Sequence, residues 1–219
     1  MQFNARLIVF DVDGTLADSI GRIIEVMQVA SVNCKVRRPS TSDVRNVIGM
    51  TLRKAIAALM PEYSDEKVDE VTEEYRRLYK EMEDRDPVRL YPSVISTLQT
   101  LKQQGFELAI ATGKSRAGLE RIYINSGLRE LITCAVSGDM VKSKPDPMML
   151  QTILEHYGLK PEQALMVGDS NLDLRMATNA GVPSIGITWG VHPREVLEKE
   201  SPVAIIGDVC ELPDLVNFS

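Results

Sequence analysis

Residues 7–16, Leu-Ile-Val-Phe-Asp-Val-Asp-Gly-Thr-Leu, decide the fold of this 219-residue chain. The first four form a continuous apolar run, which is typical of a strand buried on both faces of a sheet. Asp11 and Asp13 follow directly, and side chains two positions apart on an extended chain point to the same side. Gly14 then permits a sharp turn. Two carboxylates crowded at the end of a buried strand need a divalent cation or a proton to offset their repulsion.

Taken alone, the same stretch also fits a solvated Asp-Gly turn. An EF-hand calcium loop starting at Asp11 would need glycine at its sixth position and glutamate at its twelfth. Those positions hold Leu16 and Arg22. Calcium sensing by an EF-hand is therefore excluded, and the rest of the chain decides between a turn and a metal site.

The net charge and the cysteine pattern limit what kind of partner the protein binds and where it is found. A net charge of -6 argues against nucleic acid or an anionic membrane as the main partner, because both need concentrated positive charge. Three cysteines without a Cys-x-x-Cys pair favour free thiols in a reducing cytosol. The chain also lacks a leader pattern and an apolar run of ~20 residues. These features predict a soluble, cytoplasmic protein that binds a small molecule, and they leave monomer and homodimer open.

Residues 18–87 read as helical, without a convincing strand. Apolar residues recur at helical spacing from Ile20 to Ala30 and again from Leu52 to Met60. Ser64 is a candidate N-cap for a long charged helix, and a turn-rich joint at residues 37–42 separates the first two helices. We therefore expect an all-helical insertion at 18–87 within a core made of residues 1–17 and 88–219.

From residue 88 onward, predicted helices alternate with predicted strands. The strands are expected at residues 107–111, 134–136, 164–167 and 183–187, with a further candidate at 203–206. Such alternation predicts an α/β fold with a doubly wound, mostly parallel sheet. Ligands of these sheets bind beyond the carboxyl ends of the strands, where the strand order reverses. Asp11, Thr112 and Asp169 all follow predicted strands.

The stretch Thr112-Gly113-Lys114-Ser115 is not a P-loop, because Leu108 occupies the position of the required earlier glycine. The Thr112 hydroxyl and nearby backbone amides could instead hold a phosphate oxygen, or Thr112 could simply cap a helix.

Two further stretches offer charged groups. Lys144 stands between Ser143 and Pro145, and proline restricts the local backbone, so the lysine is either held against the carboxylates or solvated. Asp169 follows Gly168 at a strand end, and Asp173 lies one helical turn later, where each could also act as a helix cap. Carboxylates from separate strands favour an oxygen-lined Mg²⁺ site.

Together these stretches resemble the haloacid dehalogenase superfamily, in particular its phosphoglycolate phosphatase-like hydrolases with a helical cap. Residues 11–16 match the first motif, Thr112 the second, Lys144 the third, and Gly168-Asp169 with Asp173 the fourth. The resemblance implies a Rossmann-like core with an inserted helical cap. It also implies a Mg²⁺-dependent phosphatase that cleaves a small phosphorylated metabolite through an aspartyl phosphate, with 2-phosphoglycolate as a candidate substrate.

The resemblance assigns roles to individual residues. Asp11 would be the nucleophile and Asp13 the general acid and base. Thr112 and Lys144 would hold the phosphoryl oxygens. The remaining assignments are Asp11, Asp169 and the carbonyl of Asp13 as metal ligands, and Gly113, Gly168 and Asp173 as supporting residues. Substrate choice would belong to the cap, where basic residues could bind a substrate carboxylate or could be ordinary solvated helix charges. The candidates for substrate contact are Arg45, Gly49 and Arg53.

Other activities remain open at this point. Sugar-phosphate mutases of similar architecture carry a histidine in the first cap helix, where this chain has Ile23 and Ile24, which disfavours a mutase. Phosphonate hydrolases need a cap lysine, for which Lys35, Lys54, Lys67 and Lys80 are candidates. A non-catalytic module that binds phosphometabolites is disfavoured by Asp11, because binding alone needs no nucleophile. Dehalogenases lack the second aspartate, so Asp13 disfavours cleavage of carbon-halogen bonds.

Overall fold

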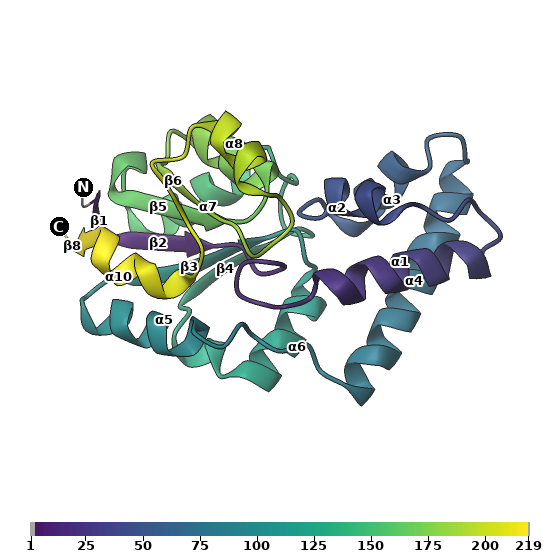
Figure 1. Cartoon of the computed structure of the whole chain (residues 1–219), viewed down its shortest axis with the longest axis horizontal. Coiled ribbons are helices and arrows are strands. Elements are labelled where there is room, and N and C mark those ends of the chain that lie inside the picture. The colour runs from purple at the N-terminus through teal and green to yellow at the C-terminus, as the bar shows by residue number, and fades with distance from the viewer. Residues whose placement is uncertain (1–2, 219) are drawn as a thin grey trace.

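A six-stranded parallel sheet forms the centre of the computed structural model, which describes residues 3–218 (Figure 1). Hydrogen-bonded neighbours follow the order β4-β3-β2-β5-β6-β7. The strands are β2 (Leu7–Phe10), β3 (Glu107–Thr112), β4 (Cys134–Ser137), β5 (Ala164–Gly168), β6 (Ser184–Ile187) and β7 (Ala204–Ile206).

Strand β2 occupies the middle of the sheet and explains where a ligand can bind. The chain runs outward from β2 through β3 to β4 on one side, and from β5 through β6 to β7 on the other. The strand order therefore reverses beside β2, and the carboxyl ends of β2 and β5 meet there. The predicted doubly wound parallel sheet is confirmed.

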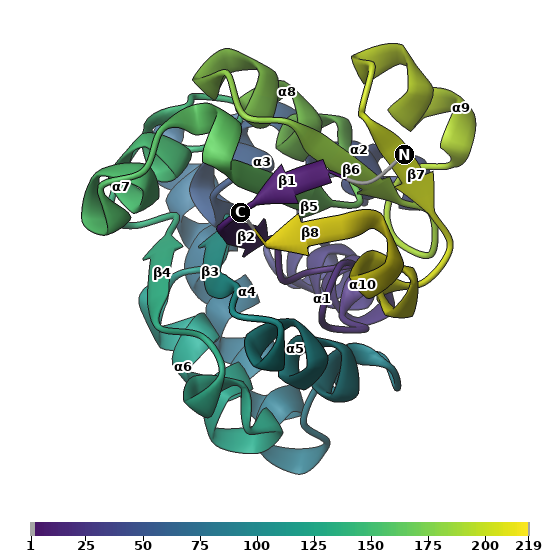
Figure 2. The ribbon, with the colours of Figure 1, turned by 90° about the vertical axis from the view of Figure 1, so that its left-hand side faces the viewer.

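Helices cover both faces of the sheet (Figure 2). Alternate residues of β2 divide between the two cores: Ile8 and Phe10 face one, whereas Leu7 and Val9 face the other. The first core includes residues of α5 (Val94–Gln103), α6 (Arg116–Ser126) and α10 (Leu212–Leu215), and the second includes residues of α7 (Met148–Tyr157) and α8 (Asn171–Ala180). Helix α9 (Arg194–Leu197) packs near β6. Short 3-10 turns occur at Leu128–Glu130, Pro161–Gln163, Glu198–Glu200 and Val209–Glu211.

Four helices between β2 and α5 form a separate layer with its own hydrophobic cluster. They are α1 (Ile20–Asn33), α2 (Thr41–Val47), α3 (Leu52–Leu59) and α4 (Asp65–Arg85), at the right of Figure 1. Ser64 caps α4 as predicted, by accepting a hydrogen bond from the Lys67 amide. The exact division at residues 18 and 87 stays a prediction.

Helix α2 was not predicted. The pattern at residues 37–42 predicts only a turn-rich joint, but Ser40 and Asp43 form a capping box that starts a seven-residue helix. Its two buried residues, Val44 and Val47, are too few to show a helical period.

A two-stranded parallel sheet joins the two ends of the described chain. β1 (Phe3–Ala5) pairs with β8 (Val216–Phe218), and the Phe218 ring meets Phe106 edge-on with 5.7 Å between ring centroids. Both ends lie on the side of the molecule opposite the helical layer (Figure 1). Among the helices within residues 3–218, none is both long and apolar enough to span a bilayer.

Candidate active site

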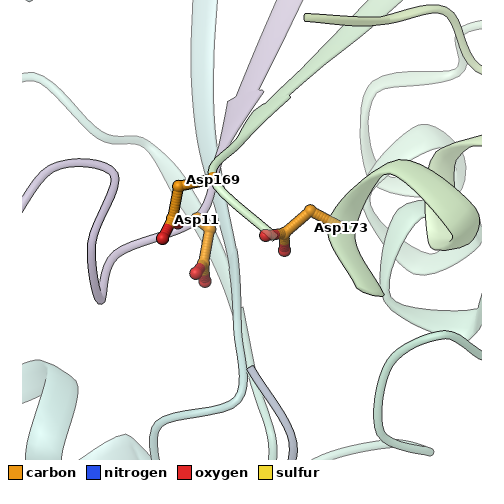
Figure 3. Close-up of side chains that lie close together, drawn as sticks. All are labelled: Asp11, Asp169 and Asp173. Atoms are coloured by element: carbon orange, nitrogen blue, oxygen red, sulfur yellow. The ribbon is translucent and has the colours of Figure 1, made fainter. Parts of the chain in front are cut away.

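Three buried aspartates meet beyond the carboxyl ends of β2 and β5 (Figure 3). Asp11 directly follows β2, Asp169 directly follows β5, and Asp173 lies in the first turn of α8. Phe10 pairs with Val167 across the two strands, so the residues that follow lie close together. One carboxylate oxygen from each aspartate lies within 4.8 Å of the others.

Lys144 joins two of these carboxylates. Its Nζ atom lies 2.7 Å from Asp11 Oδ1 and 2.6 Å from Asp173 Oδ1, and the lysine side chain is fully buried. The cluster thus contains one ammonium and three carboxylates, so it has an excess of negative charge when all of them are ionised. The alternative of a solvated Lys144 is excluded by this geometry.

Burial and the neighbouring negative charges raise the pKa values of two of these carboxyl groups. Burial raises the pKa of Asp11 to about 7; Lys144 opposes this rise, whereas Asp173 and Asp13 add to it. Burial, with the charges of Asp173 and Asp11, also raises the pKa of Asp169 well above its usual value. A bound cation would favour the ionised forms of these groups.

Hydrogen bonds hold two of the carboxylates in place. The Thr15 hydroxyl donates to Asp169 Oδ1 at 2.6 Å, and the Val191 amide donates to Asp169 Oδ2 at 2.7 Å. Asp173 Oδ2 accepts from the amide and hydroxyl of Ser170, at 3.0 and 2.6 Å. A fixed, buried set of oxygen donors with excess negative charge fits a hard divalent cation.

Asp13 lies apart from this cluster. Its Oδ1 atom accepts a hydrogen bond from the Ser19 hydroxyl at 2.6 Å and pairs with Lys114 Nζ at 2.8 Å. Its carboxylate is therefore not among the clustered ligands, and the proposed role of its carbonyl stays a prediction.

Lys114 contacts Asp13, although the sequence around it indicated only an incomplete P-loop motif. Its side chain is just 9% exposed. The one available sign was its position two residues after Thr112, which ends the strand beside β2.

The predicted glycines lie where chains approach closely. A Cβ atom on Gly113 would lie 2.4 Å from the Gly49 carbonyl oxygen, and one on Gly168 would lie 2.4 Å from Asp173 Cβ. Thr112 is buried, and its Oγ1 atom accepts from the Lys114 amide at 3.2 Å, while Ser115 is the N-cap of α6.

A cavity of about 620 Å³ separates the helical layer from the carboxyl ends of the strands. Asp11 and Asp13 line it, together with Gly49 and Arg53. Arg53 already pairs with Asp69 at 2.6 Å and Asp65 at 2.8 Å.

Arg45 is not among the residues that line this cavity. Its Nη1 atom donates instead to the carbonyl oxygens of Gly190 at 3.3 Å and Val191 at 3.1 Å. Contact of Arg45, Gly49 or Arg53 with substrate stays a prediction.

Comparison with known proteins places this geometry in context. The family model described as haloacid dehalogenase-like hydrolase matches residues 8–187. A probable phosphatase, IndB, of Dickeya dadantii is 31% identical over 94% of this chain and 91% of its own. A phosphoglycolate phosphatase of Vibrio cholerae is 32% identical over 98% of both chains. A crystal structure described as a predicted phosphoglycolate phosphatase from Haemophilus somnus superposes with a TM-score of 0.83, at 26% identity, over 96% of this chain and 97% of that one.

Proposed function

Because this chain belongs to the haloacid dehalogenase-like hydrolase family, as its motifs predicted, we propose that it hydrolyses a small phosphomonoester with Asp11 as nucleophile. The observation that carries the proposal is that Asp11, which lines the cavity, pairs with buried Lys144 at 2.7 Å and lies beside Asp169 and Asp173.

In the first half of the reaction, an Asp11 carboxylate oxygen attacks phosphorus and the bond to the leaving oxygen breaks. Asp13 donates a proton to that oxygen, a contribution worth about 10²- to 10⁴-fold in rate. Lys144 and the Thr112 hydroxyl bind the phosphoryl oxygens. The products of this half are an aspartyl phosphate on Asp11 and the free alcohol.

In the second half, Asp13 takes a proton from a water molecule, whose oxygen attacks phosphorus and releases phosphate and the Asp11 carboxylate. Asp11 and Asp169, supported by Asp173, would hold Mg²⁺. When bound, the ion would offset the negative charges of the carboxylates and the phosphoryl group. Lys144 keeps Asp11 directed toward the cavity in both halves.

The candidate substrate is 2-phosphoglycolate. A relative that matches 98% of this chain bears the name phosphoglycolate phosphatase. The cavity of about 620 Å³ accepts a ligand of this size with room to spare.

The test is phosphate release from 2-phosphoglycolate, sugar phosphates, nucleotides and para-nitrophenyl phosphate, with Mg²⁺ and with EDTA. Wild-type protein should release phosphate from at least one of them in Mg²⁺, and EDTA should abolish release. Asp11→Asn should lower kcat by at least about 10³-fold, because the nucleophile is lost.

Asp18→Asn is the matched control, since it removes an exposed carboxylate seven residues along the chain that does not line the cavity. Its activity should stay within about twofold of wild type. Full activity of Asp11→Asn, or no release from any substrate by wild type, would refute the proposal.

A further inference from the structure

Besides Asp11 and Asp13, the cavity is lined by three side chains that carry N–H or O–H donors. Lys114, Tyr79 and Arg121 all line it, and they come from three separate segments: the loop after β3, helix α4 and helix α6. Figure 1 shows α4 and α6 beside each other at this side of the molecule.

Lys114 has hydrogen-bonding capacity left. An ammonium group carries three N–H donors, and within residues 3–218 the ion pair of Lys114 is with Asp13 Oδ1 at 2.8 Å. Its Nζ atom also lies 5.1 Å from the centroid of the Tyr79 ring, which supports a cation there. Burial opposes the charge, but the neighbouring Asp13 raises the pKa of Lys114 overall, so the ammonium is retained at neutral pH.

Two further donors at this wall are buried without an acceptor of normal hydrogen-bond geometry, although the Tyr79 hydroxyl interacts with the Lys114 ammonium. The Tyr79 hydroxyl and Arg121 Nη1 have no acceptor of normal geometry among the described residues. Arg121 Nη1 reaches Asp84 only at 3.7 Å, as an ion pair. A buried donor without an acceptor is destabilising, so an anion that enters the cavity and accepts from these groups would be favoured.

Asp139, a further acidic residue of the same cavity, does not supply the missing acceptor. Its carboxylate already accepts from the Ser137 hydroxyl at 2.6 Å and the Arg116 amide at 3.0 Å. The two cap arginines expected to read a substrate carboxylate are also engaged: Arg45 with backbone carbonyls and Arg53 with two aspartates.

We propose that Lys114, with the Tyr79 hydroxyl, binds a second anionic group of the substrate and thereby selects phosphomonoesters of short hydroxy acids. The spacing supports a short substrate. Asp13 must lie within about 3.2 Å of the leaving oxygen to give it a proton. Lys114 lies 2.8 Å from the same carboxylate, so an anion held by Lys114 is only a few atoms from the leaving oxygen. This inference rests on the proposed phosphatase activity.

The site formed by Lys114 and Tyr79, here called the subsite, depends on the relative position of the core and the helical layer. Lys114 comes from the core and Tyr79 from the helical layer, so the subsite forms only when both are arranged as in this structure. An anion bound between them would favour that arrangement.

The experiment compares kcat/KM for 2-phosphoglycolate with that for ethyl phosphate, in which a methyl group replaces the carboxylate. Wild type should prefer 2-phosphoglycolate. In Lys114→Met this preference should fall by about 10- to 100-fold, the range for hydrogen bonds to charged groups, while Lys114→Arg should retain most of it. Tyr79→Phe should lower it by about threefold to tenfold. Lys160→Met, which changes an exposed lysine outside the cavity, should leave the preference unchanged.

A binding measurement tests the same selectivity without requiring that the substrate be hydrolysed. In an Asp11→Asn background, calorimetry should show tighter binding of 2-phosphoglycolate than of ethyl phosphate, and Lys114→Met should remove the difference. An equal loss for both ligands would mean that Lys114 acts only on Asp13, and an unchanged preference would also overturn the inference. Hydrolysis of para-nitrophenyl phosphate tests the phosphatase activity separately. If wild type cleaves this ester but does not prefer 2-phosphoglycolate to ethyl phosphate, the inference about Lys114 is refuted while the proposed phosphatase activity stands.

Discussion

At the scale of single residues, Asp11 links activity to stability. Burial raises its pKa from 3.8 to about 7 in the metal-free protein. The folded state therefore keeps a proton that the unfolded chain releases above about pH 4. Stability that depends on this proton is fully present below pH 4 and is lost as the pH rises toward 7, by up to about 4 kcal/mol.

Asp11→Asn isolates this effect, because asparagine resembles the protonated aspartate in shape. In EDTA at pH 8 the variant should have a higher unfolding free energy than wild type, and the difference should shrink toward pH 4.5. Urea denaturation at both pH values measures it. Mg²⁺ should raise the stability of wild type more than that of the variant, because an ion held by the ionised cluster, as proposed, would stabilise the folded state. A wild type that is more stable than the variant in EDTA at pH 8 would contradict this account.

Some residues of the site could be predicted from the sequence, and one could not. Asp11, Asp169 and Lys144 stand at strand ends or in rigid loops, so their positions could be predicted and the structure brings them together. Lys114 could not be identified in this way. Its environment depends on Tyr79, which is 35 positions earlier in another layer, and no local pattern reports such a contact.

At the scale of elements, the helical layer comes close to the core at Gly113. The loop between α2 and α3 lies so close to Gly113 that a Cβ atom there would be 2.4 Å from the Gly49 carbonyl oxygen and 2.7 Å from that of Met50. Gly113→Ala should therefore displace this loop from the cavity.

We expect Gly113→Ala to lower kcat/KM by about 10²-fold, since a shift of about 1 Å can cost that much. Gly21→Ala is the matched control: a Cβ atom on this helical residue meets nothing within 4 Å. It should leave the activity unchanged and raise stability by about 0.5–1 kcal/mol. Steady-state kinetics with thermal melts of both variants make the comparison, and equal activities would argue against a close contact at Gly113.

Strands β1 and β8 could not be predicted for a different reason from helix α2. Strands β1 and β8 contain three residues each, and they exist because distant segments pair. The strands β2, β3, β5 and β6 are buried apolar runs bounded by turn residues, which is why sequence alone located them.

At the scale of the whole molecule, the paired ends lie far from the cavity. Phe218 is 49% exposed and contacts the Phe106 ring, so Phe218→Ala should destabilise the protein by about 1 kcal/mol. Activity below the melting temperature should match wild type, because no part of the site touches this end. A change in KM would show that the two regions are coupled.

The same pairing bears on how the molecule resists force. β1 and β8 run parallel, with Phe3 opposite Val216 and Ala5 opposite Phe218. Tension applied through the two ends would pull these strands in opposite directions along their length, so their hydrogen bonds would be loaded in shear together rather than opened one by one. Under mechanical extension, this small sheet would have to rupture before β2 and β5, the strands that precede Asp11 and Asp169, bear any load.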